Sequence, residues 1–222
     1  MADELTITTI VSKLFGENTY VAHFEGRSDC LVFDPGLEPS RIVEYLEGRG
    51  LTPAAILCTH GHSDHIAGNA VLKRRWPACP LLIGAGDAAK LTDPGLNLSA
   101  AFGFSVTSPP ADLLVRDGET YAAAGFELAI RETPGHSVGH VIFLTCGTCP
   151  VRVFAGDLLF QGSVGRTDFP DGDFATLARA IREKVFTLPD DTIILPGHGA
   201  PTTTGEERRM NPFVGVPAGD VV

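Results

Sequence analysis

Short apolar segments alternate with turns and helical repeats along most of the chain. Residues 5–24 (LTITTIVSKLFGENTYVAHF) are rich in Thr, Ile, Val and aromatic side chains, and they predict two strands joined by a turn near Gly16. Other short apolar runs stop at glycine or at polar residues, which is typical of buried strands. Such strands are predicted within residues 30–36, 54–60, 80–87, 111–117, 126–135, 140–146, 151–157 and 192–198.

Helical spacing of apolar residues occurs between several of these predicted strands. Residues 39–50 and 174–188 have the pattern of amphipathic helices, and a third helix is expected from Asp64 or Ile66 to about Arg75. Residues 87–110 are rich in Gly, Pro and Ser and predict a short helix with a mobile loop. The order of strands and helices predicts an α/β fold that packs in layers.

Composition and charge limit the classes of binding partner and the cellular compartment that we expect. The chain has 222 residues, 44% of them hydrophobic, and a net charge of −10. An acidic chain is a poor match for nucleic acid or for an anionic membrane surface. No segment approaches the roughly 18 consecutive apolar residues of a membrane-spanning helix. The start, MADELTITTI, lacks the basic and apolar regions of a signal peptide. We therefore expect a cytoplasmic protein without nucleic-acid or membrane partners.

The five cysteines are an odd number, which does not suit a framework of disulfides. Cys30, Cys58 and Cys79 lie in or near apolar segments, so we expect buried, reduced thiols. Cys146 and Cys149 form a C-x-x-C pair between two predicted strands. We interpret this segment as a hairpin turn, and redox activity or metal binding are the alternatives.

Side chains that bind metals follow four of the predicted strands. His60, His136, Asp157 and His198 each come where an apolar run gives way to a loop. Ligands of layered α/β proteins tend to bind at the carboxyl ends of strands. Four such coincidences in one chain predict that these residues meet at one site.

The stretch THGHSDHIAGN (residues 59–69) adds three more candidate ligands. His60 and His62 are two residues apart, so in an extended segment they face the same side. Asp64 and His65 come after an expected turn at Ser63 and can reach a neighbouring ion. The candidates then number seven, which is too many for one tetrahedral zinc and suits two ions that share a ligand. Zinc, iron and manganese all suit such a donor set.

These motifs resemble those of a known family. THGHSDHIAGN resembles the H-x-H-x-D-H motif of the metallo-β-lactamase superfamily, and ETPGHSVGH, FAGDLLF and LPGHG resemble its later metal-binding motifs in the same order. The resemblance implies an αββα sandwich. It also implies how two metal ions are held: the first by His60, His62 and His136, the second by Asp64, His65 and His198, and both by Asp157.

Two further stretches resemble the compact relatives of glyoxalase II (hydroxyacylglutathione hydrolase): residues 156–173 and 205–214. They imply a metal-dependent thioesterase that hydrolyses hydroxyacylglutathione-like thioesters through a metal-bound hydroxide, with zinc favoured over iron or manganese. Asp64 is expected to accept a hydrogen bond from the attacking water. Only 24 of the 222 residues follow His198. We therefore expect one domain over residues 1–222, without the helical C-terminal domain of glyoxalase II proper. The thiol, the acyl group and the oligomeric state stay open.

Other functions remain compatible with these motifs. Persulfide dioxygenases of the same superfamily have a stretch similar to Gly165–Phe169, and they hold one iron by residues that match His60, His136 and Asp157. A lactonase-like hydrolase would use the same metal ligands. A sensor or binding module without catalysis would be expected to lack a ligand, and none of the seven candidates is missing.

Four more residues are weighed as contributors to the site. Arg166 is a candidate for binding a substrate carboxylate, or it pairs internally with Asp168. Asp34 either orients an imidazole or forms a turn, and Thr59 is interpreted mainly as the end of a strand. His140 is expected to be structural or to support a ligand, without binding metal itself.

Overall fold

Two six-stranded sheets form the centre of the protein in a computed structural model that describes residues 4–218. In the first sheet, strands β1, β2 and β3 are antiparallel neighbours, and β3, β4, β5 and β6 run parallel. The order of this sheet is β1 (Leu5–Val11), β2 (Asn18–Phe24), β3 (Asp29–Phe33), β4 (Thr52–Cys58), β5 (Leu81–Gly84) and β6 (Leu113–Val115).

The second sheet comes mainly from the C-terminal half of the chain. Its strands are antiparallel neighbours except for β10 and β13, which run parallel. Its order is β14 (Thr202–Thr203), β13 (Ile193–Pro196), β10 (Arg152–Gly156), β9 (Val141–Thr145), β8 (Phe126–Glu132) and β7 (Thr120–Ala123). A separate ribbon pairs β11 (Leu159–Phe160) with β12 (Ser163–Val164).

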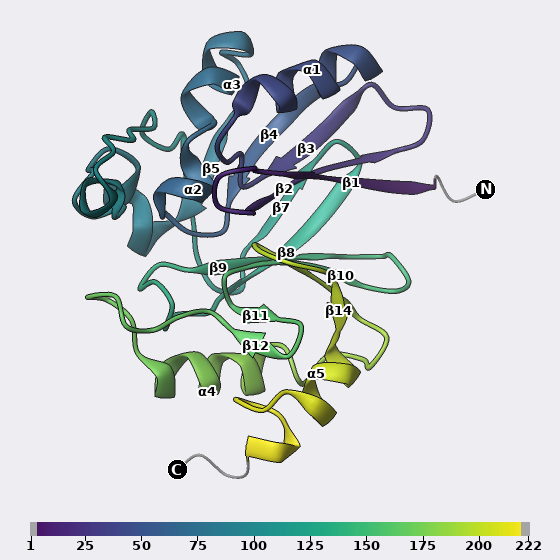
Figure 1. Ribbon diagram of the computed structural model, residues 1–222. Helices are drawn as coiled ribbons and strands as arrows, with labels where there is room; N and C mark the ends of the chain where they lie inside the picture. The colour runs from purple at the N-terminus through teal and green to yellow at the C-terminus, as the bar shows by residue number, and fades with distance from the viewer. Residues whose placement is uncertain (1–3, 219–222) are drawn as a thin grey trace.

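Helices cover the outer faces of both sheets. Helices α1 and α3 lie over the first sheet, and α4 and α5 lie over the second, so the layers follow the order α, β, β, α (Figure 1). The predicted αββα sandwich is confirmed. The α-helices are α1 (Pro39–Arg49), α2 (Ser63–Ile66), α3 (Asn69–Arg75), α4 (Phe174–Lys184) and α5 (Thr204–Met210). Short 3₁₀ helices are η1 (Ala85–Leu91), η2 (Ser99–Phe102) and η3 (Val216–Ala218).

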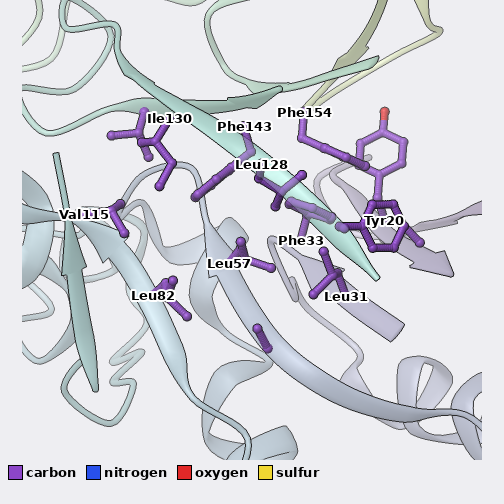
Figure 2. Close-up of a cluster of buried hydrophobic side chains, with 14 of the residues drawn as sticks. Tyr20, Leu31, Phe33, Leu57, Leu82, Val115, Leu128, Ile130, Phe143 and Phe154 are labelled. Atoms are coloured by element: carbon purple, nitrogen blue, oxygen red, sulfur yellow. The ribbon is translucent and has the colours of Figure 1, made fainter. Parts of the chain in front are cut away.

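The main apolar core lies between the two sheets. Figure 2 shows its side chains, with Phe33 and Leu57 from the first sheet facing Phe143 and Phe154 from the second. The rings of Phe33 and Phe154 stack with their centroids 3.6 Å apart. Two further clusters fill the spaces between the first sheet and helices α1 and α3, and between the second sheet and α4. The sheets therefore form a firm support for the loops at their ends.

The helix expected over residues 64–75 is broken into α2 and α3. The break falls at Gly68, whose backbone N–H donates to the carbonyl of Pro35 at 2.7 Å. A Cβ atom at this glycine would lie 2.8 Å from the same carbonyl oxygen, which is too close for any other residue. Contact with the loop after β3 therefore replaces a continuous helix and leaves α2 as a single turn that carries Asp64 and His65.

Other boundaries also differ from the sequence pattern. The strand expected over residues 80–87 ends at Gly84, and η1 follows it. Strand β7 was missed within residues 111–145 because its residues alternate between exposed and half-buried, without a buried side to signal a strand. The β9–β10 hairpin is confirmed, with exposed free thiols at Cys146 and Cys149.

The burial of the other three cysteines and the lengths of the helices agree with what the sequence predicts. Cys30, Cys58 and Cys79 are free and buried, as expected. Burial raises the pKa of Cys30 and of Cys79 to about 12, which keeps both thiols protonated. Within residues 4–218, no helix is long and apolar enough to cross a bilayer. The cytoplasmic location and the single domain stay predictions.

Candidate metal centre

The structure brings the seven predicted ligands together at one end of the two sheets. His60 follows β4 of the first sheet, while His136, Asp157 and His198 follow β8, β10 and β13 of the second. Strand ends from both sheets therefore meet here, as the sequence pattern predicts. His62, Asp64 and His65 lie on the loop and short helix after β4. Nitrogen and oxygen atoms of these residues form clusters small enough to hold a metal ion.

The first cluster consists of His60, His62 and His136, all buried. The Nε2 atom of His136 lies 3.3 Å from Nε2 of His60 and 2.9 Å from Nδ1 of His62. Nitrogen ligands about 2.0–2.1 Å from a tetrahedral ion lie about 3.3 Å from one another. The three imidazoles thus have the spacing of a metal site.

The second cluster consists of Asp64, His65 and His198. The Oδ2 atom of Asp64 lies 3.4 Å from Nε2 of His198 and 3.8 Å from Nε2 of His65. This cluster is less buried than the first, because the side chains of Asp64 and His198 are partly open to solvent. A second ion here would be closer to the entrance than the first.

Asp157 lies between the two clusters. Its Oδ2 is 3.5 Å from Nε2 of His136 in the first cluster and 3.6 Å from Nε2 of His198 in the second. Its Oδ1 is 3.4 Å from Nε2 of His65. This position is the one that a shared ligand would occupy, although the bridging role itself stays a prediction.

Whether these residues suit a metal can be judged from buried polar atoms that have no hydrogen-bond partner. Nε2 of His65 and Oδ1 of Asp157 are buried and have no hydrogen-bond partner among the described residues. Such atoms are costly in a folded protein unless something else satisfies them. Both atoms point into the cluster, and imidazole and carboxylate donors suit a divalent ion. The residues therefore fit a metal centre.

A relay of hydrogen bonds orients two of the imidazoles. The Asp34 carboxylate accepts hydrogen bonds from the Thr59 hydroxyl at 2.7 Å and from Nδ1 of His65 at 3.2 Å. Nδ1 of His60 lies 3.1 Å from the Thr59 hydroxyl, so this N–H donates to it. Each imidazole then has its Nε2 lone pair free to face a metal. The interpretation of Thr59 as the mere end of a strand was wrong, because its hydroxyl links His60 to Asp34.

The loop after β12 orients a third imidazole. Nδ1 of His136 donates to the backbone carbonyl of Arg166 at 2.8 Å. The side chain of Arg166 forms a two-pronged ion pair with Asp168, at 2.7 Å for both contacts, and its guanidinium lies 4.1 Å from the ring centre of Phe169. The predicted internal pair is confirmed. Arg166 also lines the pocket described below, so its role with substrate stays a prediction.

The electrostatics of the first cluster favour the neutral imidazoles that metal ligands need, whereas in the second cluster nearby carboxylates outweigh burial and raise the pKa of His65 and of His198. Burial and the neighbouring His136 lower the pKa of His62 to about 3, and burial lowers the pKa of His60 well below its usual range. Both imidazoles are then neutral and can bind a cation. Burial alone would raise the pKa of Asp157, but His65, His136 and His198 together outweigh burial and keep that pKa below its usual range.

A buried ion-pair network supports the same loops, and sequence reasoning missed it. The Asp87 carboxylate accepts hydrogen bonds from the backbone N–H of Gly61 at 2.7 Å and from the hydroxyl of Ser137 at 2.5 Å. Lys90 donates to Ser137 and to the carboxylate of Asp171, the latter at 2.5 Å. The network therefore touches the neighbours of His60, His62 and His136. No sequence motif marks these residues, since partners bonded to each other lie up to 81 positions apart.

A pocket of about 400 Å³ opens above the two clusters. Five of the predicted ligands line it: His62, Asp64, His136, Asp157 and His198. Its other walls are largely aromatic and aliphatic, and Arg166 is the one lysine or arginine among the described residues that line it. A small molecule in this pocket would contact the metal ligands directly.

The family model of the metallo-β-lactamase superfamily matches residues 13–198, which include every predicted ligand. The chain belongs to the metallo-β-lactamase superfamily. Members with this fold bind divalent metal ions, and the His-rich centre described above is where this member would hold them.

Curated relatives in the superfamily cover nearly the whole chain. One is a probable metallo-hydrolase, YqgX, of Bacillus subtilis, which is 40% identical over 83% of this chain and 87% of its own length. Another is the hydroxyacylglutathione hydrolase GloC of Haemophilus influenzae, which is 36% identical over 86% of this chain and 90% of its own length. The chain is therefore a metallo-hydrolase of this superfamily, similar to a glyoxalase II-like enzyme.

Solved structures of the superfamily superpose closely. The BLEG-1 B3 metallo-β-lactamase is 34% identical with a TM-score of 0.89, covering 94% of this chain and 99% of its own. TTHA1623 in a di-iron-bound form is 34% identical with a TM-score of 0.80, over 93% and 99%. ETHE1 from Myxococcus xanthus is 27% identical with a TM-score of 0.78, over 94% and 84%.

Two more histidines of this superfamily member lie outside the clusters. His140 is buried, with Nδ1 2.9 Å from the Thr133 hydroxyl and its ring stacked on that of His60 at 5.2 Å. It packs behind a predicted ligand, in line with the expected supporting role. His23 lies on β2, where its Nδ1 is 3.3 Å from the carbonyl of Phe24.

Asp34→Ala is expected to weaken metal binding by about ten- to a hundredfold, because His65 and Thr59 would lose their common acceptor. The unpaired backbone N–H of Thr59, now bound to Asp34 at 2.7 Å, should also cost about 1–3 kcal/mol of stability. Zinc titration with a competing chelator measures the affinity. The matched control is Asp29→Ala, which removes an exposed ion pair with Arg27 at the start of β3, the strand that Asp34 follows. Equal metal affinity in both variants would contradict the role given to Asp34.

Proposed function

We propose that the protein is a dinuclear metallohydrolase that cleaves thioesters of the hydroxyacylglutathione type. The observation that carries the proposal is the complete second cluster, Asp64, His65 and His198, beside the first, with Asp157 between them. Hydrolases that attack with an activated water commonly use two such ions. The similarity to GloC, a hydroxyacylglutathione hydrolase, supports the choice of thioesters.

The seven side chains would hold the two ions in the arrangement that the sequence motifs predict: His60, His62 and His136 for the first, Asp64, His65 and His198 for the second, and Asp157 for both. Bound divalent ions would acidify a water and stabilise negative charge on the carbonyl oxygen of the substrate. We propose zinc as the resident metal, with iron or manganese as alternatives, because nitrogen and oxygen donors suit all three. The di-iron form of TTHA1623 shows that a relative can hold iron.

Asp64 is the residue that we assign to the attacking water. Its carboxylate lines the pocket and is partly open to solvent, so a water there can donate a hydrogen bond to it. Burial opposes its ionisation, but His65 and His198 together outweigh burial and lower the pKa of Asp64. The carboxylate is therefore ionised at neutral pH and can orient the water. The leaving thiol, with an ordinary pKa of about 8.5, needs little help from an acid.

Release of thiol from S-D-lactoylglutathione tests the proposal. Zinc-replete protein should release thiol continuously, and protein stripped by a chelator should not until zinc is returned. A thiol reagent follows the reaction. A protein that contains two ions per chain yet releases no thiol would overturn this substrate class.

Persulfide dioxygenation is the second candidate. The structural similarity to ETHE1 and the Gly165–Phe169 stretch favour it, and it would require a single iron at His60, His136 and Asp157. Oxygen uptake with glutathione persulfide, together with one iron per chain, would replace the hydrolase proposal. Two ions per chain with thiol release would exclude the dioxygenase.

Arg166→Ala tests whether this guanidinium binds a substrate carboxylate. We expect the KM for S-D-lactoylglutathione to rise about three- to tenfold with little change in kcat, because an exposed charge contact contributes modestly to binding. The matched measurement uses a neutral N-acetylcysteamine thioester, whose KM should stay within twofold. An equal change for both substrates would show that Arg166 acts only by holding the loop through Asp168.

The predicted partner is thus a small-molecule thioester, and no nucleic acid or membrane partner is proposed. A cytoplasmic location is proposed from the composition alone. The oligomeric state is left open.

A further inference from the structure

The pocket above the metal ligands has apolar walls from both halves of the fold. Phe15 lies on the loop between β1 and β2, and Leu98 and Phe102 lie at η2, all in the first half. The second half contributes Phe160, Val164 and Phe169. A water-filled polar site would not need six such side chains. Their position beside Asp64 and His198 points to an apolar part of the substrate next to the bond that is cleaved.

The wall from the first half of the fold, formed by Phe15, Leu98 and Phe102, is held in place by specific contacts. The rings of Phe15 and Phe102 meet edge to face with centroids 6.2 Å apart. Asn97, which is fully buried, accepts a hydrogen bond on its carbonyl from the backbone N–H of Ser63 at 3.0 Å. Ser63 directly precedes Asp64, so the wall is joined to the second metal cluster. Its position relative to the reacting atoms is therefore fixed by the fold.

Leu98 shows that the fold places an apolar side chain here at a conformational cost. Its φ angle is 68°, in the left-handed region that glycine or asparagine usually occupies. Branched residues in this conformation are strained, and such strain tends to occur at functional sites. Leu98 lines the pocket beside Phe15 and Phe102.

The same wall continues outward as exposed apolar surface. Phe102 and Phe104 each keep about half of their surface in solvent, at 52% and 50%, and Leu14 keeps 61%. Leu14 and Phe104 line a smaller pocket that shares Phe15 and Ser63 with the main one, and large apolar side chains gathered in this way are typical of a binding surface. Arg166, the one lysine or arginine among the described residues that line the pocket, is already paired with Asp168. The pocket thus offers more to an apolar group than to a charged one.

We infer that the centre takes thioesters with an apolar acyl group of several carbons, which packs against Phe15, Leu98 and Phe102. The inference rests on the proposed thioester hydrolysis and names its acyl group. A short hydroxyacyl group would leave this wall in water, whereas an alkyl chain or a ring would cover it. Burial of each additional methylene then favours binding.

Thioether analogues test the inference separately from hydrolysis, because a thioether cannot be hydrolysed. Binding of S-methyl-, S-propyl- and S-hexylglutathione to the zinc-replete protein is measured by calorimetry. Affinity should rise about two- to fourfold for each methylene that enters the pocket. Phe102→Ala should weaken S-hexylglutathione about tenfold and S-methylglutathione less than twofold. Phe213→Ala is the matched control, since Phe213 is similarly exposed, at 45%, and does not line the pocket, and it should change neither affinity.

Leu98→Gly gives a second variant whose folding is not in doubt, because glycine relieves the left-handed strain. It should weaken S-hexylglutathione while raising or preserving the unfolding temperature. Equal affinity for the three thioethers, or no measurable binding of S-hexylglutathione, would overturn the inference. Rising affinity with chain length but no turnover of lactoyl, butyryl or hexanoyl thioesters would refute the proposed hydrolysis and leave the apolar subsite standing.

Discussion

Asp157→Ala is expected to lower thioester hydrolysis by at least about a hundredfold and to reduce the metal content of the purified protein. Loss of one residue that merely orients a metal ligand typically costs ten- to a hundredfold, and Asp157 contacts both clusters directly. Without the Asp157 carboxylate, the site also loses the oxygen atom that lies 3.4 Å from Nε2 of His65. Neither ion would then keep a full set of ligands.

Metal analysis of the protein and thiol release from S-D-lactoylglutathione are measured on the same preparation. Asp117→Ala serves as the matched control, because Asp117 forms an exposed ion pair with Lys184 away from the site, and this variant should retain both metal and activity. Asp157→Asn keeps the shape of the side chain and tests its charge. A variant at position 157 that still holds two ions and turns over at the full rate would contradict a shared ligand.

The metal ligands could be predicted from the sequence because they occur in short motifs at the ends of strands. His60 and His62 share one side of an extended segment, and His136, Asp157 and His198 each follow an apolar run that predicts a strand. The structure places each of them in a group of three side chains whose ligand atoms lie close enough together to hold one ion. A local pattern sufficed for these residues, because the layered fold directs the ends of such strands to one edge.

The partners of the ligands could not be predicted in the same way. Asp34 belongs to a D-P-G sequence that equally suits a turn, and only the contact with His65, 31 positions away, distinguishes the two interpretations. Arg166 supplies a backbone carbonyl to His136, and any residue at that position could do so. Contacts of this kind depend on the packing of distant loops and leave no pattern in the sequence.

The fold shows the same difference between features set by a local sequence pattern and features set by distant contacts. Amphipathic helices α1 and α4 and the buried strands were predicted, since each has one clearly apolar side. The break between α2 and α3 was not, because it depends on the close approach of Gly68 to Pro35. Strand β7 was missed, since it offers little buried surface at the edge of its sheet. The periodicity of apolar residues indicates which side of a helix or strand is buried. It does not predict local structure that depends on a tertiary contact.

Lys90→Met is expected to lower the free energy of unfolding by about 3 kcal/mol, because removal of one partner leaves a buried carboxylate without its cation. Asp87 is fully buried, and the ammonium group of Lys90 lies 3.3 Å from its Oδ1 and 2.5 Å from Asp171. Methionine fills a similar volume but carries no charge. The Asp87 carboxylate would keep the N–H of Gly61 and the hydroxyl of Ser137, which are neutral donors.

A lysine-to-methionine substitution in an exposed ion pair provides the control. Lys184→Met breaks the surface pair with Asp117, and such pairs contribute about 0–1 kcal/mol. Urea unfolding of metal-free protein measures both variants without a contribution from bound ions. Lys90→Met should also weaken zinc binding, because the network contacts Gly61, between His60 and His62, and Ser137, next to His136. Equal stability of the two variants would show that the buried network does not hold the metal loops, since removing its only lysine would then cost no more than removing a surface charge.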